Sequence, residues 1–207
     1  SNRVLSSMTE HASEKAEKFL KSMGVNIWTS TRVSSYNGLD VETDKENFQA
    51  ETLIWAAGVK GATLPGIDNA NIVNGRLEVD HFNKVVGYEN IFAAGDVAHM
   101  VTEEFPNGLP MLGSVAQQQG KHLSKNLKNI VRGKKLIPFK YKDKGTMATI
   151  GRNKAVVDLP KYSFSGFFAW LTWMFVHLML LVDFRSRLVV FVNWSWSYFC
   201  YDKGTRL

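Results

Sequence analysis

The stretch over residues 91–98 (Ile-Phe-Ala-Ala-Gly-Asp-Val-Ala) constrains the fold of this chain more than any other. Its apolar and small residues predict a buried strand over 91–94, after which Gly95 allows a close approach of the backbone to another group. Asp96 then stands at the carboxyl end of the strand, where open α/β sheets bind their ligands. A carboxylate only accepts hydrogen bonds, so Asp96 favours a sugar or polyol hydroxyl. The alternative is an ordinary Gly-Asp turn after a buried strand.

A second stretch, over residues 52–59, repeats the pattern of apolar residues followed by small residues and glycine, and it predicts a second buried strand. Ala57 and Gly58 in this stretch favour a close approach of the backbone to a ligand or to a neighbouring element. For Gly58 alone, tight packing against a neighbour is the stronger alternative. The chain therefore contains two strand ends at which the backbone is expected to approach a ligand or a neighbouring element closely.

The other elements are predicted from periodicity and turn residues. Ser7 and Glu10 form a capping-box pattern ahead of a helix that ends at Gly24. A longer helix is predicted over 112–130, and three glutamines near its start can exchange hydrogen bonds with whatever Asp96 faces, although surface glutamines are also common. Strands are predicted over 25–29, in short pieces within 31–48, and over 138–141, 146–150 and 154–159.

Charge is distributed unevenly along the chain. The total is +6, but residues 1–119 sum to −6, residues 120–154 to +10 and the remainder to +2. A basic block of this size attracts nucleic acid, anionic lipid or an acidic partner, or it forms a solvated face. Aromatic residues are not interspersed among its lysines, so we predict no nucleic-acid partner.

Two apolar runs follow the basic block, over residues 167–182 and 188–201. The first is shorter than the roughly 20 apolar residues that a spanning helix needs, and the second contains aromatic residues that prefer the headgroup boundary. We predict two helices, or a helical hairpin, that enter one leaflet of an anionic membrane. A buried core or a dimer interface is the alternative. The predicted boundary residues are Trp170, Trp173, Trp194, Trp196, Tyr198 and Tyr201.

Several protein classes are excluded by what the sequence lacks. Cys200 is the single cysteine, which excludes a disulfide framework, a zinc cluster and a dithiol relay and fits a reducing compartment. The sixteen glycines never occur two residues apart, so there is no Gly-x-Gly-x-x-Gly turn to hold a dinucleotide pyrophosphate. No Walker, zinc-protease or Gly-x-Ser-x-Gly motif occurs, and we predict neither a metal site nor a catalytic side chain. An Asp suited to ribitol without a pyrophosphate turn indicates part of a larger protein.

Four segments together resemble the C-terminal half of type II NADH dehydrogenases. They are residues 52–59 (Thr-Leu-Ile-Trp-Ala-Ala-Gly-Val), 90–98 (Asn-Ile-Phe-Ala-Ala-Gly-Asp-Val-Ala), 117–120 (Gln-Gln-Gln-Gly) and 143–151 (Asp-Lys-Gly-Thr-Met-Ala-Thr-Ile-Gly). Residues 169–171 and 193–198 are similar to the membrane-anchoring segment of that family. The resemblance implies an α/β fold: part of a flavoprotein with two Rossmann-like dinucleotide-binding domains, followed by a membrane-associating α+β region.

The resemblance also implies an activity. Such enzymes are non-proton-pumping NADH:quinone oxidoreductases of the respiratory chain with non-covalent FAD, held peripherally on the cytoplasmic face of the bacterial inner membrane and often dimeric. A hydride passes from NADH to FAD, and two electrons pass on to a membrane quinone. Because the cofactor carries this chemistry, no protein nucleophile is needed.

Individual residues take roles from the resemblance. Lys144 would lie near both the flavin and the quinone, where its charge stabilises the reduced anionic ring. Ser114 replaces the first glutamine of the family's quinone-site pattern, which leaves the contacts to the quinone head and the quinone type open. The implied FAD-binding residues are Gly95, Asp96, Ala116, Gln117 and Lys144; the NADH side has Ala57 and Gly58, and the quinone site has Ala116, Gln118 and Lys144.

The family pattern divides the chain into three predicted parts. Residues 1–60 would end the NADH-binding domain, 61–120 would end the FAD-binding domain, and 121–207 would form the C-terminal membrane-anchoring and dimerisation domain. The family's two glycine-rich loops lie in a first half that this sequence does not include. We therefore expect this polypeptide alone to bind FAD poorly and not to turn over NADH, whereas the parent protein would do both. We also expect a homodimer that buries sheet edges and the apolar runs.

Other readings remain open. A sulfide:quinone oxidoreductase shares the fold, but its chemistry needs paired cysteines, and this chain has one. Another flavoprotein reductase of the same superfamily would lack the Trp-rich apolar runs. A non-catalytic membrane-docking or dimerising fragment needs only the basic block and those runs.

Overall fold

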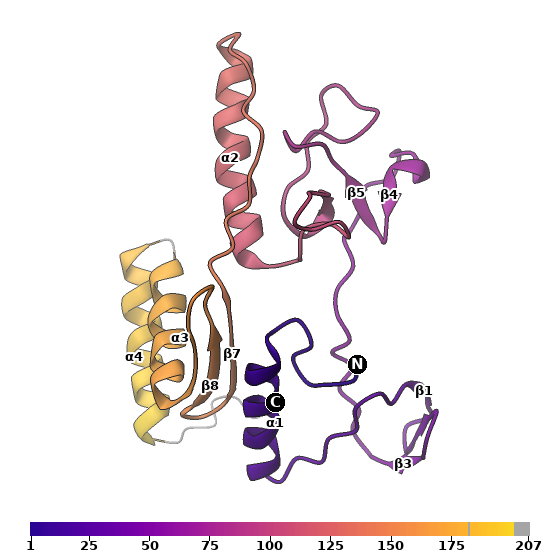
Figure 1. The fold of residues 1–207 in the computed structure, drawn as a ribbon, viewed down its shortest axis with the longest axis vertical. Coiled ribbons are helices and arrows are strands. Elements are labelled where there is room, and N and C mark those ends of the chain that lie inside the picture. The colour runs from indigo at the N-terminus through magenta and orange to yellow at the C-terminus, as the bar shows by residue number, and fades with distance from the viewer. Residues whose placement is uncertain (182, 201–207) are drawn as a thin grey trace. The chain divides into compact units, whose positions relative to one another are not determined.

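The computed structural model describes residues 1–181 and 183–200 (Figure 1). The chain forms two compact units: residues 1–53 together with 144 onward make the first, and residues 54–143 make the second. The first contains both termini of the described chain and the two apolar runs. Tyr201 and the end of the sequence, like Val182, lie outside the described residues.

Helix α1 (Glu10–Ser22) opens the first unit, and its start corrects one prediction. The N-cap is Thr9, whose side chain accepts a hydrogen bond from the Ala12 N–H at 3.3 Å, so the predicted capping box at Ser7 is wrong. The extended backbone of Thr9, with φ −60° and ψ 157°, directs its hydroxyl at that N–H. The helix ends at Ser22 with Met23 as its C-cap, and Gly24 follows at φ +81°, as predicted.

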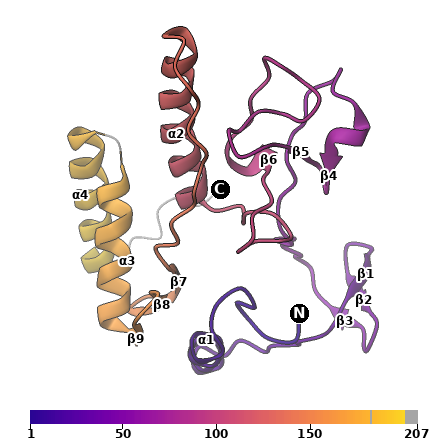
Figure 2. The same ribbon diagram turned by 45° about the horizontal axis from the view of Figure 1, so that its top comes forward.

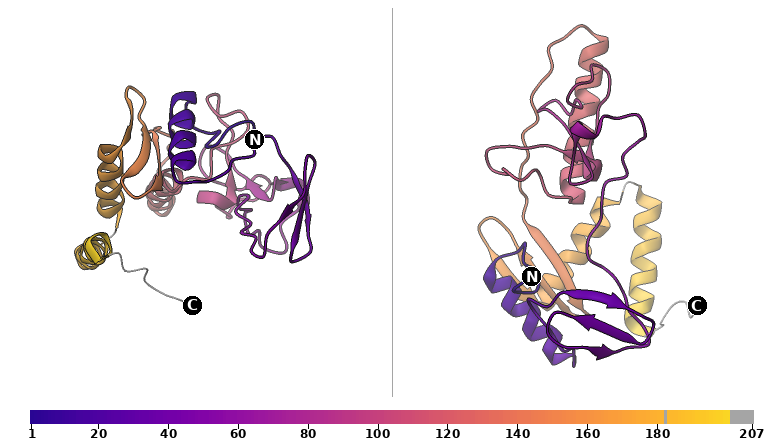
Figure 3. Two further views of the ribbon diagram at one scale, coloured as in Figure 1. Left: turned by 90° about the horizontal axis from the view of Figure 1, so that it is seen from below. Right: turned by 90° about the vertical axis from the view of Figure 1, so that its right-hand side faces the viewer.

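An antiparallel sheet forms the core of this unit. Strand β7 (Thr146–Gly151) pairs with β8 (Lys154–Asp158), which pairs with β9 (Ser163–Gly166). The predicted strands 146–150 and 154–159 are confirmed, and β9 was not predicted. Alternate residues of β8 face opposite ways: Val156 packs with the Ala12 side of α1, whereas Val157 packs with Ala169 of α3 (Phe167–Leu180). Figure 3 shows the sheet between these two helices.

Helix α4 (Phe184–Cys200) packs along α3, so the predicted pair of helices is confirmed (Figure 2). Trp173 and Trp194 stack at 6.0 Å between ring centroids, and Trp170 and Tyr198 lie 5.4 Å apart. The outer surfaces of both helices are strongly apolar, with Phe168 76% exposed and several similar residues along α4. Within residues 1–181 and 183–200, no helix combines the length and the apolarity that crossing a membrane requires.

A second small sheet in this unit comprises β1 (Val33–Tyr36), β2 (Asp40–Thr43) and β3 (Phe48–Gln49), all antiparallel. It confirms the short strands predicted within 31–48. Residues 25–29 form no strand, contrary to prediction. Instead the indole of Trp28 donates to the Glu46 carboxylate at 2.7 Å and packs edge-on against Phe48, so this segment is held by side chains rather than by a ladder.

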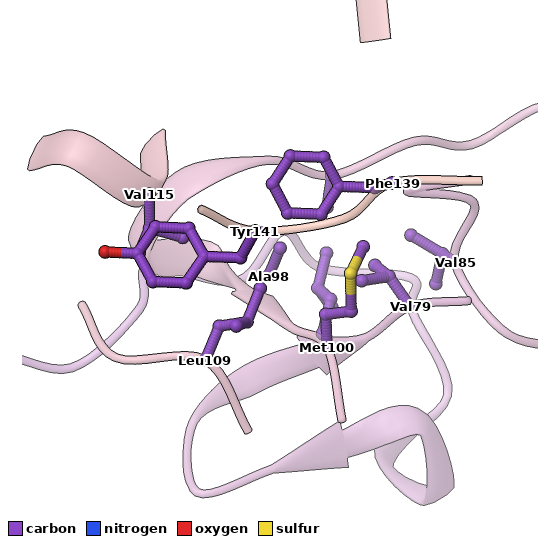
Figure 4. Close-up of a cluster of buried hydrophobic side chains, with 10 residues drawn as sticks. Val79, Val85, Ala98, Met100, Leu109, Val115, Phe139 and Tyr141 are labelled. Atoms are coloured by element: carbon purple, nitrogen blue, oxygen red, sulfur yellow. The ribbon is translucent and has the colours of Figure 1, made fainter. Parts of the chain in front are cut away.

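The second unit is built around a buried cluster (Figure 4). Strand β5 (Arg76–Glu78) pairs antiparallel with β4 (Ile72–Val73) and parallel with β6 (Ala98–His99), and a 3₁₀ turn, η1 (Asn69–Asn71), precedes them. A second 3₁₀ turn, η2 (Gly95–Val97), leads into β6, and α2 (Gly113–Val131) confirms the second predicted helix. The cluster's buried members are Leu77, Val79, Val85, Ala93, Ala98, Met100, Leu109, Val115, Phe139 and Tyr141.

Three further predicted strands are wrong. Residues 91–94 form only an isolated bridge, between Phe92 and Lys84, and 138–141 are irregular although Phe139 is buried and its N–H donates to the His81 carbonyl. Residues 52–59 are extended and exposed, with Ile54 at 85% and Trp55 at 67%. A strand needs neighbours that take up its backbone N–H and C=O groups, and no ladder partner for 52–59 occurs among the described residues.

Candidate functional site

The Gly95–Asp96 turn forms the centre of the candidate site. Gly95 has φ +75°, a left-handed conformation that favours glycine, and it starts η2. A Cβ at this position would lie 3.3 Å from the Cβ of Ala116, so the turn packs closely against the start of α2. Asp96 is exposed. The structure thus brings together Gly95, Asp96 and Ala116 from the predicted FAD set, with an accessible carboxylate beside a helix start.

The three consecutive glutamines of α2 have three different environments. Gln117 is exposed. Gln118 makes two hydrogen bonds to Lys142: its Nε2 donates to the backbone carbonyl at 3.0 Å, and its Oε1 accepts from the N–H at 3.1 Å. Gln119 is fully buried, and its Oε1 accepts from the Gly95 N–H at 2.7 Å. The sequence pattern suggested that glutamines face Asp96, and Gln119 is the one that secures this turn.

Arg76 is a second buried anchor that the sequence analysis missed. Its Nη2 donates to the carbonyl of Ala98 at 2.5 Å and to that of Leu109 at 3.0 Å, so it ties the end of η2 to the segment that leads into α2. Burial lowers the pKa of the Arg76 guanidinium, and the carboxylate of Asp96 opposes that shift. Arg76 therefore positions both sides of the site and puts positive charge behind the Asp96 turn.

The segment that carries Ala57 and Gly58 reaches this turn a few residues later. Both residues are exposed, and Gly58 has φ +96°; a Cβ added there would have no described heavy atom of another segment within 4 Å. At Gly61, by contrast, an added Cβ would lie 2.6 Å from the Gly75 carbonyl oxygen and 3.2 Å from the Val97 Cα. Gly61 thus allows the chain to pass directly over η2, a role that the sequence analysis did not assign.

The remaining predicted residues belong to the first unit. Lys144 is exposed just ahead of β7, and Gly145 follows at φ +88°. Trp170, Trp173 and Trp194 lie at the α3–α4 contact, and Trp196 is 63% exposed on α4. Among the described residues, no group of three or more His, Cys, Asp or Glu side chains could hold a metal ion.

The residues around Gly95 fit the ribityl and phosphate part of a flavin nucleotide. The Asp96 carboxylate can accept from hydroxyl groups, and α2 begins after Leu112 without a side-chain cap, which leaves a helix start suited to acceptor oxygens. The buried Nε2 of Gln119 has no hydrogen-bond partner in the described structure, although its Oε1 is engaged. An acceptor atom supplied by a ligand is one way to satisfy it.

Comparison with known families divides the chain into two matched regions. The family model described as pyridine nucleotide-disulphide oxidoreductase matches residues 1–120. The model described as NDH2 C-terminal domain matches residues 144–201.

Curated relatives and solved structures agree with these matches. The chain is 32% identical to the type II NADH:quinone oxidoreductase NdhA of Mycobacterium tuberculosis and covers 45% of its length, with 97% of this chain aligned. It is 31% identical to the type II NADH:quinone oxidoreductase of Staphylococcus aureus over 74% of this chain and 39% of that protein. The chain therefore spans less than half the length of these relatives.

Two solved structures share the fold. NDH2 from Plasmodium falciparum in complex with NADH superimposes with a TM-score of 0.83 at 20% identity, covering 96% of this chain and 56% of that one. A sulfide:quinone oxidoreductase from Aquifex aeolicus gives 0.58 at 18% identity, covering 79% and 42%. The higher score extends over nearly the whole chain, including the region of α3 and α4.

Proposed function

Because the chain belongs to the pyridine nucleotide-disulphide oxidoreductase family, we propose that it is the flavin- and membrane-facing part of a type II NADH:quinone oxidoreductase. The predicted family and fold class are confirmed by the two matched regions and by the fold comparison. The proposed reaction is transfer of a hydride from NADH to FAD and of two electrons onward to a membrane quinone. The observation that carries the proposal is the Gly95–Asp96 turn held against α2.

FAD, when bound, supplies the two-electron chemistry, because it can accept a hydride and be reoxidised by a quinone. The residues of this chain bind and orient that cofactor. Asp96 accepts hydrogen bonds from ribityl hydroxyls, and Gly95 lets the backbone approach the phosphate region. Ala116 and Gln117 line the isoalloxazine side at the start of α2. Gln119 and Arg76 hold the turn in this geometry from behind.

Four further residues are proposed to face the two substrates, NADH and quinone. They are Lys144, Gln118, Ala57 and Gly58. Lys144 would bring a positive charge near the flavin and the quinone, and that charge would stabilise a reduced, anionic flavin ring. Gln118 contributes to the quinone side together with Ala116, and its two hydrogen bonds to Lys142 would hold its side chain in one orientation. Ala57 and Gly58 border the nicotinamide.

We further propose that α3 and α4 attach the protein peripherally to the cytoplasmic face of a bacterial inner membrane, with Trp170, Trp173, Trp194 and Trp196 at the headgroup boundary. The exposed phenylalanines and leucines of both helices support this attachment, since a large exposed apolar surface is rarely left in water. A homodimer that covers part of this surface remains part of the proposal.

The visible absorbance of bound flavin tests the proposal. In the longer protein that carries this chain, Asp96→Ala should lower FAD retention on gel filtration by at least about tenfold, because charge-assisted hydrogen bonds are each worth about 1.5–3 kcal/mol. Glu89→Ala, which removes an exposed carboxylate elsewhere in the same unit, is the matched control. Equal flavin retention in both variants would exclude Asp96 from the site.

The isolated 207-residue chain gives a second arm of the test. We expect it to retain little FAD and not to oxidise NADH, because it has no Gly-x-Gly-x-x-Gly turn. A flavin band that NADH bleaches and a soluble quinone restores would show that this chain suffices for catalysis. No bleaching of flavin by NADH in the longer protein would overturn the proposed function itself.

A further inference from the structure

The chain that follows α2 turns back and runs along this helix, as Figures 1 and 2 both show. Residues 134–142, here called the strap, have no regular secondary structure, and they belong to the same compact unit as α2. Side chains spaced four residues apart on one face of α2 contact the strap. The contacts are Ser114 with Tyr141, Gln118 with Lys142, His122 with Phe139, and Asn126 with Ile137.

Two amide side chains fix the strap on either side of Phe139. Asn126 is fully buried; its Nδ2 donates to the Ile137 carbonyl at 2.9 Å, and its Oδ1 accepts from the Ile137 N–H at 3.0 Å. Gln118 makes the same pair of hydrogen bonds with the backbone of Lys142. Amides carry no charge at any ordinary pH, so the strength of these two contacts does not depend on protonation.

His122, between the two amides, holds the strap by packing. Its ring lies edge-on to the ring of the buried Phe139, with the centroids 5.3 Å apart and the planes at 67°. Both ring nitrogens of His122 are buried, and neither meets the geometry of a hydrogen bond with a described residue. A buried charge costs far more than a buried neutral polar group. The strength of this contact therefore depends on whether His122 carries a proton.

The groups around His122 set the direction of that dependence. Burial lowers the pKa of His122, and the charge of Lys125 on α2 adds to this shift. The backbone carbonyls of Pro138 and Ile137 in the strap oppose the shift without cancelling it. Because the pKa is lowered on balance, the closed strap binds this proton more weakly than a released strap would.

Phe139 also borders a cavity of about 300 Å³, which gives its ring room to move away from α2. The N–H of Phe139 donates to the backbone carbonyl of His81, which lines the same cavity. The titratable and charged residues of the cavity lining are His81, Glu103, Glu104, Lys140 and Tyr141. Of these, His81 carries the second imidazole near the strap.

We propose that His122 is a proton-operated latch for the strap. The neutral ring keeps Phe139 against α2, and when His122 takes up a proton from the solvent, the strap is released and the charged ring reaches water. The stability that the latch gives to the closed strap is fully present above the ordinary histidine pKa of about 6.5, and it is lost as the pH falls through the lowered value.

Release of the strap would act on the quinone side of the candidate site. Gln118, proposed above to contribute to that side, is oriented by its two hydrogen bonds to Lys142 at the end of the strap. A released strap leaves this side chain free to rotate, so we expect reoxidation of the flavin by quinone to slow in acid. This consequence rests on the proposed function, whereas the latch itself does not.

Hydrogen exchange in the full-length protein that carries this chain tests the latch. The reporters are the backbone N–H groups of Ile137, Phe139 and Lys142, each of which has a hydrogen-bond acceptor outside the strap. Their protection, relative to the intrinsic exchange rate at each pH, should fall about fivefold between about one pH unit above and one below the ordinary histidine pKa. Peptides of α2 should keep their protection.

Two kinds of variant show which group titrates. His122→Phe keeps an aromatic ring against Phe139 and cannot take up a proton, so it should make the protection independent of pH; His122→Leu serves the same purpose if the larger ring does not fit. His81→Gln removes the second imidazole and keeps the backbone carbonyl, and it should leave the acid release unchanged. Protection that is constant or rises in acid in the unmodified protein, or acid release that persists in the His122 variants or disappears in His81→Gln, overturns the latch.

Rapid mixing of the same protein separates the latch from its consequence and from the proposed function. Reoxidation of the reduced flavin by a soluble quinone should slow in acid in the unmodified protein and not in His122→Phe. A strap that opens in acid while this rate stays constant refutes the effect on the quinone side and leaves the latch standing. Failure of NADH to reduce the flavin refutes the proposed function, and the exchange result still decides on the latch.

Discussion

Residues 154–158 and residues 52–59 both have the apolar character of a strand, but only residues 154–158 form a strand. Strand β8 (Lys154–Asp158) is buried between β7 and β9, with α1 on one face and α3 on the other. Residues 52–59 have a similar composition, but Ile54 is 85% exposed and the segment has no ladder among the described residues. Composition alone does not decide the outcome, because a strand also needs partners for its backbone and both of its faces.

The difference lies in where the partners are in the sequence. The two neighbours of β8 are its immediate predecessor and successor in the chain, joined to it by short turns. Residues 52–59 would need neighbours from far away in sequence, as parallel strands do. The family's longer members contain additional chain length, and we propose that it supplies those neighbours.

The largest expected difference concerns two glycines with similar backbone angles. Gly145 and Gly58 have φ +88° and +96°, but only Gly145 has neighbours among the described residues: an added Cβ would lie 2.2 Å from the Asp158 carbonyl oxygen and 2.8 Å from the Leu159 Cα. We expect Gly145→Ala to lower the free energy of unfolding by about 3 kcal/mol or more, because backbone must move. Gly58→Ala should cost only about 1–2 kcal/mol, the strain of a left-handed backbone without any clash.

Denaturant unfolding of the two variants measures the difference in the free energy of unfolding. Hydrogen exchange in peptides that cover 144–166 and 52–60 shows which region each substitution loosens. Faster exchange in 144–166 is expected only for Gly145→Ala. Similar behaviour of both variants would mean that Gly145 is not held against β8.

The second comparison uses two valines. Val156 is fully buried against Met8, Ala12 and Ala16, whereas Val59 is 65% exposed. Val156→Ala should lower the free energy of unfolding by about 2 kcal/mol, through lost apolar burial and a residual cavity. Val59→Ala should change it by less than about 0.5 kcal/mol in this chain. The same unfolding experiment checks both values, and a cost of Val59→Ala close to that of Val156→Ala would contradict the exposed position of residues 52–59.

The parts of the fold that sequence predicted correctly are those with local causes. Helices α1, α2, α3 and α4 follow from periodicity or apolar runs, and β7 and β8 follow from alternation around a turn at Asn153, which has φ +60°. The strands predicted over 91–94 and 138–141 failed for another reason than 52–59, because both segments do find a backbone partner. The Ala93 N–H donates to the Asn83 carbonyl and the Phe139 N–H to the His81 carbonyl, but these contacts are too few to form a ladder.

In the candidate site, too, the residues that could be predicted from the sequence are those marked by a local pattern. Gly95 and Asp96 stand out in sequence because a glycine and a carboxylate after an apolar run are a local pattern. Gln119 could not be distinguished from Gln117 and Gln118, since only the helix rotation relative to Gly95 decides which one is buried. Arg76 carried no signal, because its partners, Ala98 and Leu109, are 22 and 33 residues away.

A third prediction concerns the acid end of β8. Burial raises the pKa of Asp158, but hydrogen bonds from the Ser163 hydroxyl and from Thr9 outweigh it and hold this pKa below its ordinary value. A carboxyl whose pKa is lowered by folding stabilises the protein above its unfolded pKa, about 3.9, and that contribution disappears as pH falls through the lower folded value. Asp158→Asn should therefore cost about 1.5 kcal/mol at neutral pH and flatten the acid limb of stability.

Unfolding midpoints between neutral pH and the acid limb measure this effect. Glu51→Gln, at an exposed carboxyl in the first unit, should leave both the midpoint and its pH dependence unchanged. An acid limb of Asp158→Asn as steep as that of the unmodified chain would show that another carboxyl controls the pH dependence.

The smallest effect tests how α1 is held on β8. The Thr9 side chain caps α1 through the Ala12 N–H, and the Thr9 N–H donates to Asp158 at 2.8 Å, so this one residue joins the helix start to the strand end. Thr9→Ala removes the side-chain cap and keeps the backbone donor, and it should cost about 1 kcal/mol. Ser7→Ala, at the position that sequence predicted as the cap, should change the free energy of unfolding by less than about 0.3 kcal/mol. If Ser7→Ala were the costlier change, α1 would begin two residues earlier, at the capping box predicted from the sequence. The start of α1 would then be fixed by its local sequence and not by the contact of Thr9 with Asp158 at the end of β8.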